Sequence, residues 1–165
     1  MARQLWLLRH GEAEQHGTRP DPERRLTDRG IEQARNAGVV LASLGLQFLA
    51  VLTSPKVRAA ETARLAAVAW GGEPEAYAPL ASGFDAQDAL AALAAYAGSE
   101  EDGRLLVVGH EPDFSSTVAE LTGGRVDFKK GGVAGVRVVG GRGELIALLR
   151  PSELARIAVE AADPR

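Results

Sequence analysis

Short apolar runs alternate along the chain with longer amphipathic segments, and this alternation predicts the order of strands and helices. Apolar runs of this length are too short for helices but are typical of strands buried on both faces inside a parallel sheet. We therefore expect buried strands at residues 5–8, 48–53 and 104–108, and a short edge strand within residues 75–79. Residues 133–139 and 144–149 are two further strand-like runs, and the glycine-rich residues between them predict a hairpin.

Helices are predicted between the strands from apolar periodicity and from residues that begin or end helices. Thr27 is the expected N-cap of the first helix, which Gly45 ends. Pro55 and Pro112 suit the first turns of two later helices. The helices are expected at about residues 28–44, 56–69, 85–97, 112–121 and 152–161. The buried stripe of the first helix is expected to comprise Ile31, Ala34, Val39, Leu41 and Leu44.

Strands that alternate with helices, followed by a terminal hairpin, predict a three-layer α/β/α fold with a mostly parallel central sheet. The charged, proline-containing segment 12–25 is expected to be a loop. Glycines within residues 131–135 could suggest a phosphate-binding loop, but the chain has no Walker motif and no dinucleotide fingerprint. We interpret these glycines as a tight turn and part of a strand.

Composition narrows the functional classes. The 165 residues, 45% of them hydrophobic, fit a single domain comprising residues 1–165. A formal net charge of -3 gives no general basic field for nucleic acid, so an anion site must be local. The absence of cysteine excludes disulfides, thiolate–metal sites and cysteine nucleophiles. No apolar stretch has the length of a membrane span or a signal-peptide core, so we expect a cytoplasmic protein that binds neither nucleic acid nor membrane.

Two histidines and two arginines are predicted to meet at one edge of the sheet. Arg9 and His10 directly follow the first strand, and His110 follows the strand at 104–108. Arg58 lies in the first turn of the helix after the second strand. The carboxyl ends of parallel strands line the crevice where α/β folds bind ligands. Cationic groups gathered there repel one another unless an anion neutralises them, and arginine forks match phosphate oxygens, so the grouping predicts a phosphoryl ligand.

Several of these polar residues also fit a purely structural interpretation. Arg58 taken alone would be an exposed helix residue paired with Glu61 or Glu12. His16 lies in the polar loop and is expected to be solvated. Clusters of basic residues form either a rim for an acidic protein or a phosphorylated metabolite, or only a solvated surface. Two such clusters are Arg24 with Arg25, and Lys129 and Lys130 with Arg125.

The ordered motifs of the chain resemble those of the histidine phosphatase superfamily, and they span residues 5 to about 122. The motifs are Arg9-His10-Gly11, Leu26-Thr27 followed by Gly30, Ser54-Pro55 with Arg58-Ala59 and Thr62-Ala63, and Val108-Gly109-His110-Glu111-Pro112. Within the superfamily, the short chain and the sequence from Arg9 to Ala13 resemble the SixA-type phosphohistidine phosphatases.

This resemblance implies a phosphoglycerate mutase-like fold and a phosphatase that requires no metal or other cofactor. In such an enzyme His10 attacks phosphorus and is transiently phosphorylated, while Arg9, Arg58 and His110 hold the phosphoryl oxygens. Gly11 is expected to contact the substrate, because a glycine leaves room for a ligand. The residues agree with this chemistry, since a neutral imidazole is a competent nucleophile near pH 7. The three histidines also lack metal-ligand spacing.

The chain departs from the pattern of the ester-hydrolysing branches at the general acid. By resemblance, those branches use a carboxylic acid, usually a Glu after the second helix, to protonate an alkoxide leaving group. Between Tyr77 and Ser99 the only acidic residues are Asp85 and Asp88, which suit helix capping. An imidazole leaving group needs no strong acid, so the gap favours phosphohistidine in a protein as the substrate. Glu111 or Asp85 could still act as the acid, which keeps a small phosphate ester open.

The expected partner is therefore a phosphorylated protein or a small phosphorylated metabolite. A non-catalytic module that binds phosphate is an alternative from another functional class. The chain lacks the insertions that cover the site in larger family members, so the resemblance implies an open crevice that admits a protein-borne phosphohistidine. A monomer is favoured, although the sequence leaves open both the oligomeric state and whether the loop at 12–25 closes over the site.

Overall fold

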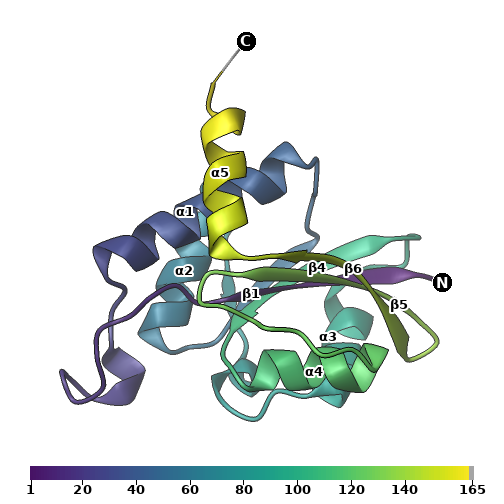
Figure 1. Ribbon diagram of the computed structural model, residues 1–165. Coiled ribbons are helices and arrows are strands. Elements are labelled where there is room, and N and C mark those ends of the chain that lie inside the picture. Colours follow the sequence, from purple (N-terminus) through teal and green to yellow (C-terminus); the bar gives the residue numbers. More distant parts are fainter. Residues whose placement is uncertain (164–165) are drawn as a thin grey trace.

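Six strands form the central sheet of the computed structural model, which describes residues 1–163 (Figure 1). The strands are β1 (Arg3–Arg9), β2 (Ala50–Thr53), β3 (Glu75–Ala76), β4 (Gly103–Gly109), β5 (Val133–Val139) and β6 (Arg142–Leu149). Their order in the sheet is β3-β2-β4-β1-β5-β6. Neighbouring strands from β3 to β1 run parallel, whereas β5 is antiparallel to both β1 and β6.

In the described chain, five α-helices cover the two faces of this sheet. On one face lie α1 (Asp28–Ser43), α2 (Val57–Ala67) and α5 (Pro151–Ala161), and on the other lie α3 (Ala86–Tyr96) and α4 (Asp113–Thr122) (Figure 1). Two 3-10 helices, η1 (Asp21–Glu23) and η2 (Ala78–Ala81), lie in the connections. The predicted three-layer α/β/α fold with a C-terminal hairpin is confirmed. Within residues 1–163, no helix is long and apolar enough to cross a membrane.

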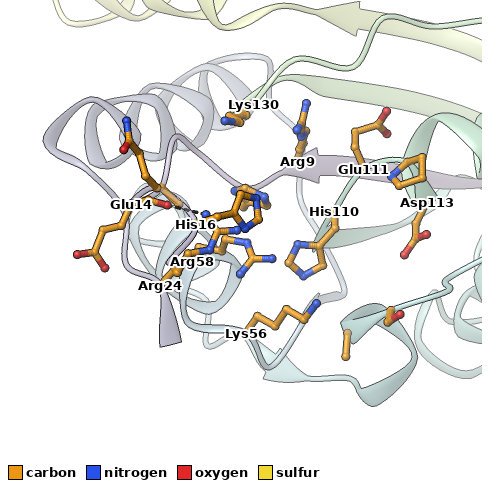
Figure 2. Close-up of a pocket in the computed structure, with 16 residues that line it drawn as sticks. Arg9, Glu14, His16, Arg24, Lys56, Arg58, His110, Glu111, Asp113 and Lys130 are labelled. Atoms are coloured by element: carbon orange, nitrogen blue, oxygen red, sulfur yellow. Dashed lines mark hydrogen bonds between the residues drawn. The ribbon is translucent and has the colours of Figure 1, made fainter. Parts of the chain in front are cut away.

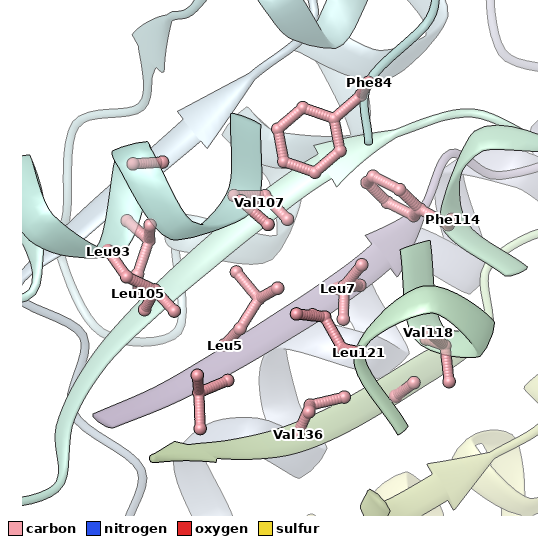
Figure 3. Packing of buried hydrophobic residues seen from close by; sticks show 14 of the residues in the cluster. Leu5, Leu7, Phe84, Leu93, Leu105, Val107, Phe114, Val118, Leu121 and Val136 are labelled. Carbon is pink, nitrogen blue, oxygen red and sulfur yellow. The ribbon is translucent and has the colours of Figure 1, made fainter. Parts of the chain in front are cut away.

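Strand β1 supplies apolar side chains to both layers of the core. Leu5 and Leu7 point toward α3 and α4 (Figure 3). Trp6 and Leu8 lie against the opposite helical layer. This double burial explains why the strand is a continuous apolar run rather than an alternating one. The indole of Trp6 fits because its neighbour on β5 is Gly135, where a Cβ would lie 2.9 Å from three atoms of the ring.

The predicted helix boundaries agree with the structure to within two residues, with differences at two prolines. Thr27 is the N-cap of α1, and its Oγ1 accepts a hydrogen bond of 3.1 Å from the Gly30 N–H. α2 begins at Val57, so Pro55 precedes the N-cap instead of lying in the first turn. Pro112 is the N-cap of α4.

The C-terminal hairpin is tighter than the sequence predicted. β6 begins at Arg142, so only Gly140 and Gly141 connect the two strands. Both glycines have positive φ, 56° and 80°. Two-residue hairpin turns of this kind require positive φ because it matches the twist of the strands.

The buried face of α1 differs from the predicted stripe. Val39 and Leu44 are 36% and 54% exposed. Ala37, Gly38 and Val40 are buried instead. The reason is that α1 packs against both α2 and α5, and small residues allow such helices to approach closely. A stripe chosen for large apolar side chains therefore missed part of the face.

Gly38 lies at the contact between α1 and α2. A Cβ there would collide with the carbonyl oxygen of Ala66 and lie 2.7 Å from its Cα. On an exposed helix face, replacing glycine by alanine stabilises by about 1 kcal/mol. Here we expect Gly38→Ala to lower the free energy of unfolding by about 1–3 kcal/mol, because the backbone of α2 must move.

Urea unfolding followed by circular dichroism measures this effect. Arg35→Ala, on the exposed side of the same helix, is the control and should change stability by less than about 0.5 kcal/mol. A Gly38→Ala protein at least as stable as the parent would contradict the close packing.

Candidate active site

The four residues expected at the sheet edge all line one pocket of about 510 Å³ (Figure 2). Arg9 and His10 come from the end of β1, Arg58 from the start of α2, and His110 from the end of β4. The pocket therefore lies where the parallel strands end. Residues 13–16 of the loop form another part of its wall.

The parallel register of β1 and β4 brings the two histidines together. Arg9 lies opposite Gly109, so the next residues, His10 and His110, leave neighbouring strands side by side. The His10 N–H donates to the Gly109 carbonyl oxygen at 3.0 Å. The two ring centroids are 5.2 Å apart, and each histidine is 7% exposed.

One tautomer of His10 satisfies its hydrogen bonding. Nδ1 lies 2.7 Å from the Gly11 carbonyl oxygen, which can only accept, so Nδ1 carries the proton and Nε2 keeps its lone pair. Burial lowers the pKa of His10 to about 3, and the neighbouring cationic groups act in the same direction. At neutral pH the ring is therefore uncharged, with a nucleophilic nitrogen at Nε2.

Gly11 orients the His10 ring and does not itself line the pocket. Its carbonyl oxygen accepts from His10, and its N–H donates to Thr62 Oγ1 at 3.1 Å. A Cβ at this position would lie 2.9 Å from the Cα of Gly30, so the close approach of α1 requires glycine. Both backbone groups are engaged within the protein and position His10. The expected substrate contact of Gly11 stays a prediction.

His110 is bonded through one ring nitrogen only. Its Nε2 lies 2.7 Å from Ser54 Oγ, which also accepts from the Lys56 N–H at 3.2 Å. We assign the Ser54 hydroxyl as the donor to His110 Nε2, so the His110 proton lies on Nδ1. This assignment gives a partner to the Ser54 hydroxyl, to His110 Nε2 and to the Lys56 N–H. Nδ1 is buried and has no hydrogen-bond partner among residues 1–163. Burial, with Arg58 nearby, lowers the pKa of His110 to about 4.

Asp21 holds the guanidinium of Arg58. Arg58 Nη1 donates to the backbone carbonyl of Asp21 at 2.8 Å, and Nη2 lies 3.3 Å from its carboxylate. Arg58 is 6% exposed, and its Nε has no partner in the described part of the chain. The ion pair therefore joins the loop to α2, and it replaces the pairing with Glu61 or Glu12 that an isolated Arg58 would make.

Asp21 also contacts other cations around the pocket. Arg24 approaches its carboxylate with Nε and Nη2 at 3.1 and 3.0 Å, and Lys56 Nζ lies 3.7 Å away. Arg24 is itself 7% exposed and donates to the Glu14 carbonyl oxygen at 2.6 Å. Burial alone would raise the pKa of Asp21, but hydrogen bonds and charges from Arg24 and Arg58 lower it below its usual value. Asp21 is thus an internal counter-ion.

Sequence reasoning did not identify Asp21 or Lys56, and it left Arg24 ambiguous. The available signal was weak, because Asp21 and Arg24 are three residues apart in a proline-containing loop with no apolar periodicity. His16 lies at the rim of the pocket with its side chain 85% exposed, in agreement with the expected solvation.

Of the two residues weighed as a general acid, Glu111 lines the pocket and Asp85 does not. The Glu111 carboxylate accepts two hydrogen bonds of 2.7 Å, from the N–H and the Oγ–H of Ser115. Asp85 caps α3 and accepts from the Asp88 N–H at 3.0 Å. The capping interpretation of Asp85 is therefore confirmed.

Two further carboxylates line the pocket, and each also accepts a backbone hydrogen bond. Asp113 accepts from the Gly83 N–H at 2.9 Å. Glu14 accepts from the Arg25 N–H at 2.8 Å, and this bond together with Arg19 lowers the pKa of Glu14. Both carboxylates are therefore held by the protein's own backbone donors.

A glycine turn braces the end of β1. The Gly131 N–H donates to the carbonyl oxygens of both Arg9 and His10, at 3.1 and 3.0 Å, and the Arg9 N–H donates to Gly132 at 3.0 Å. Gly131 has a φ of 77°. These glycines form a turn, as predicted, and not a phosphate-binding loop. The Arg9 side chain donates from Nη1 to the Phe128 carbonyl at 2.7 Å, and its Nε has no partner in the described chain.

The pocket thus combines one nucleophilic imidazole nitrogen, His10 Nε2, with the N–H donors of cationic arginines and of the neutral His110 ring. This combination suits an anion such as a phosphoryl group. Among residues 1–163, no three His, Cys, Asp or Glu side chains are grouped so that they could hold a metal ion.

Comparison with known proteins finds relatives of both the sequence and the fold. The sequence model of the histidine phosphatase superfamily, branch 1, matches residues 5–81. An uncharacterized protein of Picosynechococcus sp. is 34% identical over 140 residues, which are 81% of this chain and 84% of the relative. A 2,3-bisphosphoglycerate-dependent phosphoglycerate mutase of Azorhizobium caulinodans is 44% identical over 71 residues, 39% of this chain and 33% of the mutase.

Solved structures extend the likeness to most of the chain. The protein histidine phosphatase SixA, in complex with tungstate, superimposes with a TM-score of 0.79 and 26% identity over 92% of this chain and 99% of SixA. A phosphoserine phosphatase variant of Entamoeba histolytica, in complex with phosphoserine, has a TM-score of 0.72 and 16% identity over 92% of this chain and 99% of that one. At that identity the second likeness concerns the fold alone.

The matched segment 5–81 contains Arg9, His10 and Arg58, and the fold brings His110 to the same pocket. Sequence, fold and relatives agree that the chain belongs to the histidine phosphatase superfamily, branch 1, and is a SixA-like phosphatase.

Proposed function

We propose that this phosphatase hydrolyses phosphohistidine in a protein through a phosphoryl intermediate on His10. The observation that carries the proposal is the buried, uncharged His10 ring, whose Nδ1 is bonded to Gly11 so that Nε2 is free. Arginines beside this nitrogen would hold an anionic phosphoryl group. The 26% identity with the protein histidine phosphatase SixA over 92% of the chain supports the same substrate class.

The reaction consists of two displacements at phosphorus. In the first, the Nε2 lone pair of His10 forms a P–N bond while the P–N bond of the substrate breaks. The electron pair goes to the substrate imidazole, which leaves as a neutral ring when its other nitrogen carries a proton. In the second, water attacks phosphorus, the bond to His10 breaks and restores the Nε2 lone pair, and the water proton is released with inorganic phosphate.

Three unpaired donors support the binding of the phosphoryl oxygens. Arg9 Nε, Arg58 Nε and His110 Nδ1 are all buried without a partner in the described chain. A buried donor without an acceptor is costly, by about 1–3 kcal/mol. A phosphoryl group supplies oxygen acceptors, and donors that are fixed beforehand stabilise the charge that develops on those oxygens in the transition state.

The hydrogen bonding of the pocket carboxylates favours an imidazole leaving group. Glu14, Glu111 and Asp113 each accept a backbone N–H from the protein itself. Each carboxylate is therefore already engaged, and none is free of hydrogen bonds to approach a leaving group. An alkoxide leaving group needs a proton donor, whereas a protonated imidazole does not.

Hydrolysis of a small phosphate ester is the second candidate, because Glu111 lies in the pocket wall. In its carboxylic acid form, Glu111 would give its proton to the alkoxide and become a carboxylate, after releasing one of its bonds to Ser115. A phosphate-binding module without turnover is the third candidate, and it gives no reason for the free Nε2 of His10.

The test compares wild-type turnover of a phosphohistidine-bearing protein and of phosphoramidate with turnover of a panel of phosphomonoesters. We expect phosphohistidine to be preferred, because its leaving group needs no acid. Rapid quenching should trap acid-labile phosphate on His10. Faster turnover of esters, with the label still present on His10, would indicate that the substrate is a small phosphorylated metabolite and would make Glu111 the candidate acid.

Variants of His10 and Arg58, with His16 as a control, complete this test. His10→Ala should lose the label and all turnover while keeping its fold by circular dichroism. Arg58→Ala should lower kcat/KM by about 10²–10³-fold, because it removes donors to the phosphoryl oxygens. His16→Ala is the matched control and should stay within a few-fold of wild type, because its side chain is 85% exposed. Turnover that survives in His10→Ala would refute the nucleophile.

A bound phosphoryl group and Asp21 would neutralise the same cations. We therefore expect Asp21→Asn to lower the melting temperature, because the buried Arg24 and Arg58 lose their counter-ion. Inorganic phosphate should raise the melting temperature of this variant more than that of wild type. Differential scanning calorimetry measures both effects. Glu23→Gln, in the same 3-10 helix and with no ion pair among residues 1–163, is the control, and equal behaviour of the two variants would exclude this role.

The lowered histidine pKa values predict how stability depends on pH. The native pKa of His10 is about 3 and that of His110 about 4, both below the usual value of 6.5. Below pH 6.5 the unfolded chain binds protons that the native protein does not, so the free energy of unfolding falls as the pH falls toward 4. In His10→Asn, which cannot titrate there, the decrease between pH 6.5 and 4.5 should be smaller. Urea unfolding at the two pH values measures it, and equal decreases would show that His10 titrates normally.

A further inference from the structure

A second cavity of about 290 Å³ adjoins the catalytic pocket. The two cavities share Arg9 and Lys130 in their walls, so Arg9 lies between them. The second cavity is also lined by Arg29 and Lys129, which do not reach the first. A ligand with its phosphoryl group beside His10 would therefore bring its neighbouring groups to this second cavity.

Positive charge predominates around the second cavity. Its lining carries Arg9, Arg29, Lys129 and Lys130, and Glu12 is the single carboxylate in it. Glu12 is already engaged, since it accepts from the Thr27 hydroxyl at 3.2 Å and lies 3.8 Å from Arg29.

The two lysines of this cavity have weak counter-ions or none. Lys129 pairs at 3.2 Å with Asp127, but both side chains are more than half exposed, and such surface pairs contribute little. Lys130 makes no ion pair within the described residues. An anionic group entering this cavity would therefore reduce the repulsion between its cations.

The position of the lysines is fixed relative to the nucleophile. They directly precede Gly131, whose N–H donates to both Arg9 and His10, and the Gly132 N–H donates to the Lys129 carbonyl at 2.8 Å. On its other side the turn packs against α1, since a Cβ on Gly131 would lie 2.9 Å from the Cβ of Gln33. The backbone that carries the lysines thus has a set distance from His10.

We propose that this second cavity binds acidic side chains that flank the phosphohistidine of the partner protein. The inference rests on the proposed function. A phosphohistidine is part of a polypeptide, so residues next to it must lie on the surface beside the catalytic pocket. On this side that surface is cationic, and a partner with Asp or Glu near its phosphohistidine fits it.

The test uses two phosphohistidine peptides that differ only in having Asp or Asn beside the modified residue. For wild type at low salt, kcat/KM should be about fivefold or more higher for the acidic peptide, and the ratio should fall as salt is added. In Arg29→Gln/Lys129→Gln, the ratio should fall at least about two- to threefold toward one, because two of the four cations that line the cavity are removed. The ratio cancels any general effect on catalysis, and these two residues lie outside the catalytic pocket.

Arg35→Gln, an exposed arginine of α1 outside both cavities, is the control and should keep the wild-type ratio. Equal turnover of the two peptides by wild type, or a preference that survives undiminished in the double variant, would overturn the acidic subsite and leave the proposed function intact. No turnover of either peptide, with turnover of a small ester that carries a second anionic group, would overturn both.

Discussion

The concentration of positive charge at one edge of a parallel sheet is the constraint on which the rest of the structure depends. Arg24 and Arg58 are almost fully buried, so water reaches their guanidinium groups only to a small extent, from the pocket that both line. The protein compensates with Asp21, which contacts both. Compensation is incomplete, because buried N–H groups of Arg9, Arg58 and His110 keep no partner in the described chain. These unpartnered donors are the groups to which an anionic ligand would bind.

This balance depends on contacts between segments that are far apart in the sequence. The register of β1 with β4 brings His10 beside His110. The close contact of Gly11 with Gly30 at the start of α1 leaves the Gly11 carbonyl to orient His10. The loop at 12–25 is joined to α2 through Asp21 and Arg58. Each contact is made through backbone groups: the ladder between β1 and β4, the Gly11 carbonyl and the Asp21 carbonyl.

The fold and the four central residues of the site could be predicted because their signals are local. Apolar runs, glycines and N-caps mark the strands and helices, and Arg9, His10 and His110 directly follow such runs. Asp21 could not be found in this way, because two of its partners, Arg58 and Lys56, lie far away in the sequence and no apolar periodicity marks its own segment. The buried face of α1 was partly missed for the same reason. Gly38 is buried because it packs against α2, and the apolar periodicity of α1 does not indicate this contact. The local sequence pattern predicts the strands and helices and where they end, whereas side-chain contacts between these elements are found only in the structure.

The place of β1 in the sheet has a consequence for synthesis. β1 leaves the ribosome well before its two neighbours in the sheet, β4, which begins at Gly103, and β5, which begins at Val133. Until those strands emerge, the backbone of β1 lacks both of its ladder partners, and its apolar side chains lack most of their core. Pairing of such distant segments makes folding slow and leaves apolar surface open to aggregation. A nascent chain therefore carries the complete Arg9-His10 motif long before it can form the pocket, and phosphatase activity must wait until β4 and β5 have emerged.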